Sequence, residues 1–184
     1  GSPAENSGAG DDTPSGVLSL GFIFYYEGVA YTQYSISPDG WIRLGSGAAS
    51  AQYTNTINST TNVPKIAPLW DDLGTGTNGN VKVLVTGTAP NRIFIAQWFV
   101  TIPANLDGAA NSTFQAWLYE GTNTIEYRYG TVGTASSASG GLTGLTSSAT
   151  NFQSITFSAG TVSTVTGNNT NITTPVSGKM YRFT

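Results

Sequence analysis

The chain of 184 residues contains no cysteine and no histidine, and only 9% of its residues are charged. Without cysteine it can form no disulfide, thiolate metal site or cysteine nucleophile. Without histidine it lacks the commonest general base and the commonest zinc ligand, so catalytic triads of the Ser-His-Asp kind are excluded. No segment approaches the ~18 consecutive apolar residues that a membrane span requires. The net charge of −3 argues against nucleic acid as a partner, because phosphates attract a basic surface.

What the chain does contain is a surface solvated by Ser, Thr, Asn and Gly. An average soluble domain has about 25% charged residues, so this composition is unusual and is typical of secreted β proteins. In a protein of that character, the absence of cysteine favours a bacterial surface module that does not depend on oxidative folding. We therefore expect an extracellular location at a bacterial cell surface, beside neighbouring domains of a larger chain.

Short segments rich in β-branched and aromatic residues alternate with turn residues from Val17 onward. No ten-residue stretch has the 3.6-residue period of a helix. This pattern predicts an all-β protein, an antiparallel β-sandwich of jelly-roll-like type with long Gly/Ser/Thr-rich loops. Residues 1–15 are expected to form a flexible N-terminal arm or tag remnant, and residues 16–184 a single sandwich domain. We predict strands over residues 17–26, 31–36, 41–44, 64–73, 81–85, 93–102, 113–120, 124–129, 152–157 and 179–184.

The side chains of the clearest strands should alternate between two faces. In the segment 113–120, Phe114, Ala116 and Leu118 point one way, whereas Gln115, Trp117 and Tyr119 point the other. In the segment 41–44, Trp41 and Arg43 share one face and Ile42 and Leu44 the opposite face. Each strand is thus expected to place one set of residues in a core.

Two adjacent carboxylates, Asp71 and Asp72, follow the apolar segment 66–70. Carboxylate oxygens are the ligands that calcium prefers, and Asp107 or Asp39 could complete a site. The alternative is that one carboxylate accepts backbone N–H bonds while the other pairs with Arg or Lys. No DxDxDG loop is present, so calcium is the one candidate cofactor and none is required.

A glycosidase would need two carboxylates roughly 5–10 Å apart across a cleft. Asp71 or Asp72 could be combined with Glu120 or Glu126, but nothing in their spacing supports such a pair. We therefore expect a protein that is not an enzyme.

Aromatic residues offer a second kind of site, because their rings stack on the apolar faces of sugars. Trp70 and Trp98 lie inside apolar runs and are expected in the core. Trp41, beside a Pro-Asp-Gly turn, and Tyr53, in a polar loop, are the candidates for exposure. Together with Asp39 they form the predicted ligand-binding set.

Several segments, read in order, resemble the nidogen-like β-sandwich modules of bacterial secreted and surface proteins. These segments are GFIFYYEGVAYTQYSISPDGWIRLG, IAPLWDDL, APNRIFIAQW, FQAWLYEGTNTIEYRYG and the closing SGKMYRFT. The resemblance covers nearly the whole chain from Val17 to Thr184. It implies a non-catalytic extracellular module concerned with adhesion, matrix or glycan contact, but it carries over no binding residues.

The function expected from these observations is adhesion through a glycan, a surface polymer or another surface protein. The alternative is a structural spacer or protein-interaction module of a fibre or multidomain surface protein. Fold alone does not decide between them.

Overall fold

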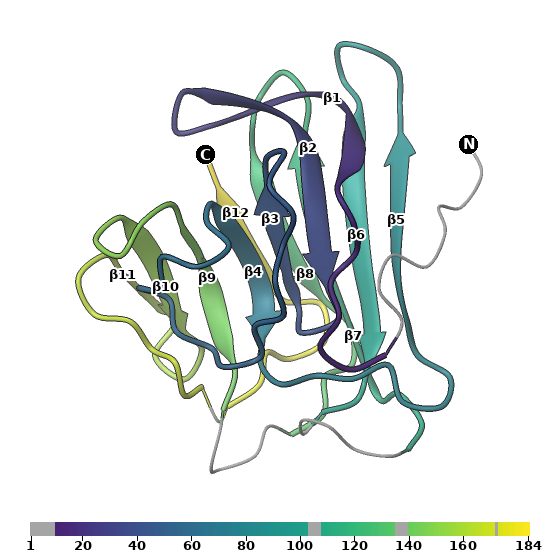
Figure 1. Cartoon of the computed structure of the whole chain (residues 1–184). Coiled ribbons are helices and arrows are strands. Elements are labelled where there is room, and N and C mark those ends of the chain that lie inside the picture. Colours follow the sequence, from purple (N-terminus) through teal and green to yellow (C-terminus); the bar gives the residue numbers. More distant parts are fainter. Residues whose placement is uncertain (1–9, 103–107, 135–139, 172) are drawn as a thin grey trace.

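The computed structural model describes residues 10–102, 108–134, 140–171 and 173–184, which form two β-sheets packed face to face (Figure 1). Every strand pair is antiparallel. The predicted all-β sandwich is confirmed. Within these ranges no helix is long and apolar enough to cross a membrane.

The described residues form one sheet of seven strands and one of five. The seven-stranded sheet has the order β1 (Leu18–Tyr26), β2 (Val29–Ser37), β3 (Trp41–Leu44), β4 (Lys65–Trp70), β9 (Leu142–Thr146), β10 (Phe152–Thr156) and β11 (Thr161–Ser163). The five-stranded sheet has the order β12 (Met180–Phe183), β8 (Ile125–Tyr129), β7 (Ser112–Tyr119), β6 (Ile93–Val100) and β5 (Asn80–Thr86).

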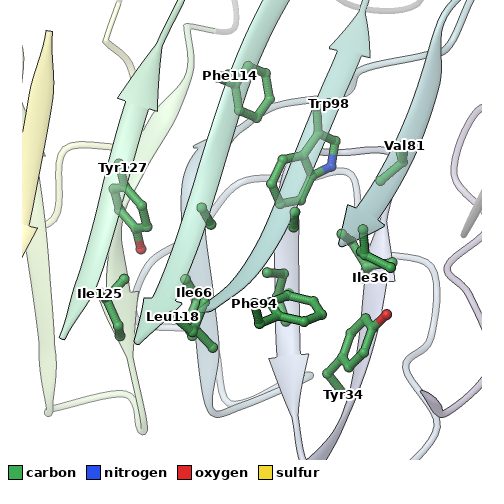
Figure 2. Packing of buried hydrophobic residues seen from close by; sticks show 14 of the residues in the cluster. Tyr34, Ile36, Ile66, Val81, Phe94, Trp98, Phe114, Leu118, Ile125 and Tyr127 are labelled. Carbon is green, nitrogen blue, oxygen red and sulfur yellow. The ribbon is translucent and has the colours of Figure 1, made fainter. Parts of the chain in front are cut away.

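The main core lies between the sheets and is built from the alternating residues of each strand. In β7, Phe114, Ala116 and Leu118 are buried as expected, and the residues between them are partly exposed. Figure 2 shows the aromatic part of this core, where Trp98 stacks on Phe114 with ring centroids 5.3 Å apart. The Trp98 indole donates to the backbone oxygen of Ser37 at 2.7 Å, so its polar atom is satisfied inside the core.

A second, smaller core lies on the outer face of the seven-stranded sheet, where the loop of residues 45–64 covers it. The strands contribute Trp41, Ala67, Trp70, Leu142 and Phe152, and the loop contributes Ile57. Because β4 is covered on both faces, all six of its residues are buried rather than alternating.

The seven-stranded sheet extends beyond the smaller sheet on one side. Tyr127 of β8 donates to the backbone oxygen of Gly144 in β9 at 2.7 Å, so these two strands face each other. Beyond β8 the smaller sheet has only β12, whereas β10 and β11 continue the larger sheet (Figure 1). The facing surface of β10 and β11 is therefore only partly covered.

The N-terminal segment has one feature that differs from the expected arm. Gly10 exchanges backbone and side-chain hydrogen bonds with Thr75, and Ser15 bonds to both backbone groups of Ile36. Residues 10–15 thus lie against the sandwich, while residues 1–9 are outside the described part of the chain.

Candidate functional site

One end of the sandwich collects the carboxylates that the sequence singled out. The turn between β2 and β3 reaches the end of β4 because Gly40, at φ +81°, has no side chain. A Cβ at this position would lie 1.8 Å from the backbone oxygen of Leu69. The close approach brings Asp39 beside Asp71, whose backbone N–H donates to the Asp39 backbone oxygen at 3.3 Å.

Asp39 is fully buried and therefore cannot contact a ligand, contrary to the sequence prediction. Its carboxylate accepts from the hydroxyl of Ser37 at 3.0 Å and from the backbone N–H of Leu73 at 3.2 Å. Burial nevertheless raises the pKa of Asp39 to about 8, assisted by the charges of Asp12 and Asp72. The residue holds the turn against the end of β4.

The acidic cluster, formed by Asp11, Asp12 and Asp72, lies beside this turn. One carboxylate oxygen from each residue lies within 4.8 Å of the other two. Oδ1 of Asp12 is buried and accepts no hydrogen bond in the described part of the protein. Burial and the charges of Asp12 and Asp11 raise the pKa of Asp72, which indicates that the three carboxylates repel one another.

The metal set predicted from the sequence is only partly assembled. Asp72 belongs to the acidic cluster, whereas Oδ1 of Asp71 accepts from the backbone N–H of Asp72 at 3.0 Å. This backbone contact is the alternative that the sequence left open for one of the two. Asp107 lies outside the described residues. Sequence reasoning missed Asp11 and Asp12 because it assigned them to a flexible arm.

The prediction that Trp41 is exposed is wrong, because its side chain is fully buried in the second core. The indole N–H groups of Trp41 and Trp70 both donate to the backbone oxygen of Gln52 at 3.1 Å. The loop of residues 45–64 covers the large apolar side chain that β3 places on the outer face of the sheet. The alternation of residues along a strand shows which face a side chain is on, but it does not show that a loop covers that face. Tyr53 is half exposed, as predicted, and is the one member of the ligand set that solvent reaches.

The opposite end of the sandwich has an open cleft of about 570 Å³ between the two sheets. We call it the end cleft, and it is lined by Tyr25, Tyr26, Glu27, Gly28, Thr122, Asn123, Ile125, Leu145, Gln153, Phe183 and Thr184. Strand β2 runs from Val29, beside this cleft, to Ser37, beside the acidic end. Its nine residues separate the two ends by about 26 Å.

The walls of the end cleft are tied together by side chains from three turns. Oδ1 of Asn123, in the β7–β8 turn, accepts from the backbone N–H of Tyr25 at 3.0 Å. Nδ2 of Asn151, in the β9–β10 turn, donates to Oε1 of Glu27 at 2.9 Å. The Asn123 contact links the two sheets, whereas the Asn151 contact ties two turns of the seven-stranded sheet together beside the cleft.

A side groove of about 330 Å³ continues from the end cleft along the partly covered face of β10 and β11. It is lined by Gln153, Ile155, Val162, Tyr181, Arg182, Phe183 and Thr184, and it shares three of these residues with the end cleft. Gln153 is exposed although it pairs with Leu145 on the inward face, because β12 does not reach far enough to cover it. The two depressions therefore adjoin each other at Gln153, Phe183 and Thr184.

The chemistry of the end cleft suits a polyhydroxylated ligand. Tyrosine rings can stack on sugar faces, and amide and carboxylate groups bind hydroxyls. Burial, with smaller contributions from Glu27 and Tyr31, raises the pKa of Tyr26, so its hydroxyl stays protonated and can donate. Tyr25 and Tyr26 lie at the end of the segment 17–26, which the sequence predicts as a strand. Nothing in the sequence separated them from the other aromatic residues, because the cleft needs five strands and turns to form.

One comparison with known proteins identifies a family. The model of the family described as NIDO related matches residues 2–184. Searches of curated proteins and of solved structures found no match.

Proposed function

Because this chain belongs to the NIDO-related family, we propose that it is a non-catalytic module that mediates adhesion by binding a glycan or a surface polymer. The proposed location is the extracellular space of a bacterium, within a larger surface or secreted protein. Composition and the resemblance to nidogen-like modules support this location.

The observation that carries the proposal is the end cleft with its continuation, the side groove. Tyr25 is 48% exposed at its mouth, and the amides of Asn123 and Gln153 line it. Binding sites combine apolar walls with a few polar groups that fix orientation, and this lining has that character.

A non-catalytic role is supported by the state of the carboxylates. The two glutamates considered for a glycosidase pair are each bound by an arginine. Glu120 accepts from Arg92 at 2.6 Å, and Glu126 accepts from Arg128 at 2.6 Å. The charge of Arg92 and its hydrogen bonds hold the pKa of Glu120 at about 2, which is unsuited to a general acid at neutral pH.

The test is a glycan array followed by calorimetric titration of any oligosaccharide that binds. Tyr25→Ala should weaken binding at least ten-fold, a value typical for the loss of one aromatic contact in a sugar site. Tyr53→Ala is the matched control, because Tyr53 is 50% exposed and lies outside the cleft. If Tyr53→Ala weakens binding and Tyr25→Ala does not, the loop is the site and the cleft is not.

The alternative function is a structural spacer that associates through its sheet edges. The observation in its favour is that both edge strands beside the side groove expose apolar residues, with Val162 of β11 at 53% and Met180 of β12 at 48%. A blank array together with self-association in sedimentation velocity would favour this function. Val162→Lys should then abolish association.

We also propose that the acidic cluster binds calcium. Calcium prefers several carboxylate oxygens as ligands, and the cluster brings one oxygen from each of three carboxylates within 4.8 Å of the others. One further oxygen, the buried Oδ1 of Asp12, accepts no hydrogen bond from the described residues. Calcium would fix residues 11–12 to the end of β4 and stiffen the end opposite the cleft.

A further inference from the structure

The tip of the β1–β2 hairpin combines an unfavourable backbone position with a charged side chain. Tyr26 pairs with Val29, so the turn consists of Glu27 and Gly28 alone. Both have positive φ, 51° and 77°. Turns of this kind favour Asn, Asp or Gly at the first position, because a longer side chain is strained in the left-handed region.

The same chain uses asparagine at the other two non-glycine positions of positive φ in its described part. These are Asn62 at 57° and Asn123 at 55°. Glu27 is the exception, and the fold offers no packing reason for it, because the residue is exposed. Strained residues of this kind persist where function requires the side chain.

The Glu27 carboxylate lies at the mouth of the end cleft, beside Tyr25 and Asn123. Asn151 holds Oε1 at 2.9 Å, which leaves Oε2 without a protein donor among the described residues. A carboxylate fixed by one oxygen can accept hydrogen bonds from neighbouring hydroxyls with the other.

The lining of the end cleft contains Glu27 but no lysine or arginine. The charge of Glu27 acts inside the cleft, since it contributes to the raised pKa of the neighbouring Tyr26. An acidic sugar in the end cleft would therefore place its carboxylate or sulfate beside a like charge, with no cation in the cleft lining to offset it. The lining of the side groove has one basic residue, Arg182, and its guanidinium is paired with Glu126 at 3.8 Å. A neutral sugar would instead donate its hydroxyls to the same group.

We propose that Glu27 makes the end cleft selective for neutral saccharides over acidic ones. This inference rests on the proposed glycan-binding function and adds the class of ligand and the residue that determines it.

The test uses two ligands that differ mainly in charge, an oligogalacturonate and its fully methyl-esterified, neutral form, beside a panel of neutral and acidic polysaccharides. The wild-type protein should bind neutral members at least ten-fold more tightly than acidic ones. Glu27→Gln keeps an acceptor oxygen and removes the charge, so it should reduce that ratio at least ten-fold. Asp72→Asn is the control, because it removes a carboxylate at the opposite end and should leave the ratio unchanged.

A second variant separates binding from folding. Glu27→Asn suits the left-handed backbone, so its melting temperature should rise while its affinity for the neutral ligand falls. A wild-type preference for acidic glycans, or a ratio unchanged by Glu27→Gln, would overturn this inference and leave glycan binding intact. If the wild-type protein binds no glycan at all, both proposals fail.

Discussion

The amine of Lys65 lies between two indole rings, 4.6 Å from the ring centroid of Trp41 and 3.6 Å from that of Trp70. Its Nζ donates to Oε1 of Gln52 at 2.6 Å, and the residue is fully buried. Cation–π contact and one neutral acceptor replace only part of the hydration that the ammonium loses. Burial consequently lowers the pKa of Lys65 to about 7, although the charge of Asp39 opposes the change.

Replacing this lysine by methionine should change how stability depends on pH. In the unfolded chain the amine has its ordinary pKa of about 10.4, so between pH 7 and 10 only the unfolded state binds the proton. The wild-type protein therefore gains stability as pH rises through that interval. Lys65→Met should be more stable at pH 6 by about 1–3 kcal/mol, because it removes a buried charge and keeps the volume. The wild-type protein gains about 4 kcal/mol between pH 7 and 10 from this one group, so the difference should vanish and then change sign toward pH 10.

The measurement is urea unfolding of both proteins at several pH values from 6 to 10. Differences between the two curves remove the contributions of titrating groups that do not interact with Lys65; Asp39, whose charge acts on Lys65, is the exception. A difference that stays constant over the whole range would show that Lys65 is not the group responsible.

Gly40 is the residue whose replacement should be most costly for the acidic end. Alanine there needs a positive φ and places its Cβ against the backbone oxygen of Leu69, which cannot move without shifting β4. Gly160 is the matched control, because it also has a positive φ, +64°, but a Cβ added there would have no atom within 4 Å. Thermal unfolding should show a loss of about 1 kcal/mol for Gly160→Ala and of 3 kcal/mol or more for Gly40→Ala. Equal losses would mean that backbone strain, rather than the close approach, sets the cost.

At the scale of elements, one glutamine makes most of the hydrogen bonds that hold the middle of the loop of residues 45–64 to the sheet. The backbone oxygen of Gln52 accepts from two indoles, its Oε1 accepts from Lys65 and Asn62, and its Nε2 donates to Ser59. The backbone of this residue thus satisfies donors from β3 and β4, and its side chain bonds to β4 and to the loop itself. The second core depends on this arrangement.

Gln52→Ala should destabilise the protein by about 2–4 kcal/mol, because it leaves the buried Lys65 amine without its acceptor. Ser59→Ala removes one partner of the same side chain and should cost less than 1 kcal/mol. Hydrogen exchange of the indole N–H groups of Trp41 and Trp70 reports directly on the loop and should accelerate in Gln52→Ala alone. Unchanged exchange in that variant would show that the loop is held by its other contacts, the apolar contact of Ile57 and the hydrogen bonds of Asn55 among them.

The strands that could be predicted from the sequence are those with one covered and one open face. In β7 the alternation is complete, and the predicted faces are those observed. Strand β9 was missed because all five of its residues are buried between β4 and β10, so it has no alternation. Its central Gly144, which reads as a loop residue, is required there because a Cβ would lie 2.2 Å from the backbone oxygen of Gln153. Strand β11 has three residues and lies in a Thr-rich stretch that carries no strand signal.

The candidate sites were less predictable than the strands, for a physical reason. Exposure of Trp41 was inferred from a neighbouring turn, but a loop distant from that turn covers it. Glu27 was not singled out, because its positive φ and its place at a cleft follow only from the assembled hairpins. Local sequence identifies the residue types a site can use, while the packing of separate elements decides which of them solvent reaches.

The whole molecule has two chemically different ends. The end cleft lies where the hairpin tips of both sheets meet, and the acidic cluster lies where the chain enters the sandwich, beside the ends of β2 and β4. The two ends are separated by the length of β2, so a ligand bound at one would have no direct contact with the other. This arrangement makes a prediction about calcium.

Calcium should raise the melting temperature, because an ion that binds only the native state stabilises it by mass action. At a concentration 100 times the dissociation constant the stabilisation is about 2.7 kcal/mol, and EDTA should reverse it. The double variant Asp12→Asn, Asp72→Asn should lose the response. Asp71→Asn should keep it, because the Asp71 carboxylate is bonded to the backbone and lies outside the acidic cluster. Glycan affinity should be the same with and without calcium, since the cluster and the cleft lie at opposite ends of β2. A response that survives in the double variant, or an affinity that depends on calcium, would mean that the ion binds elsewhere, with the cleft as the first place to search.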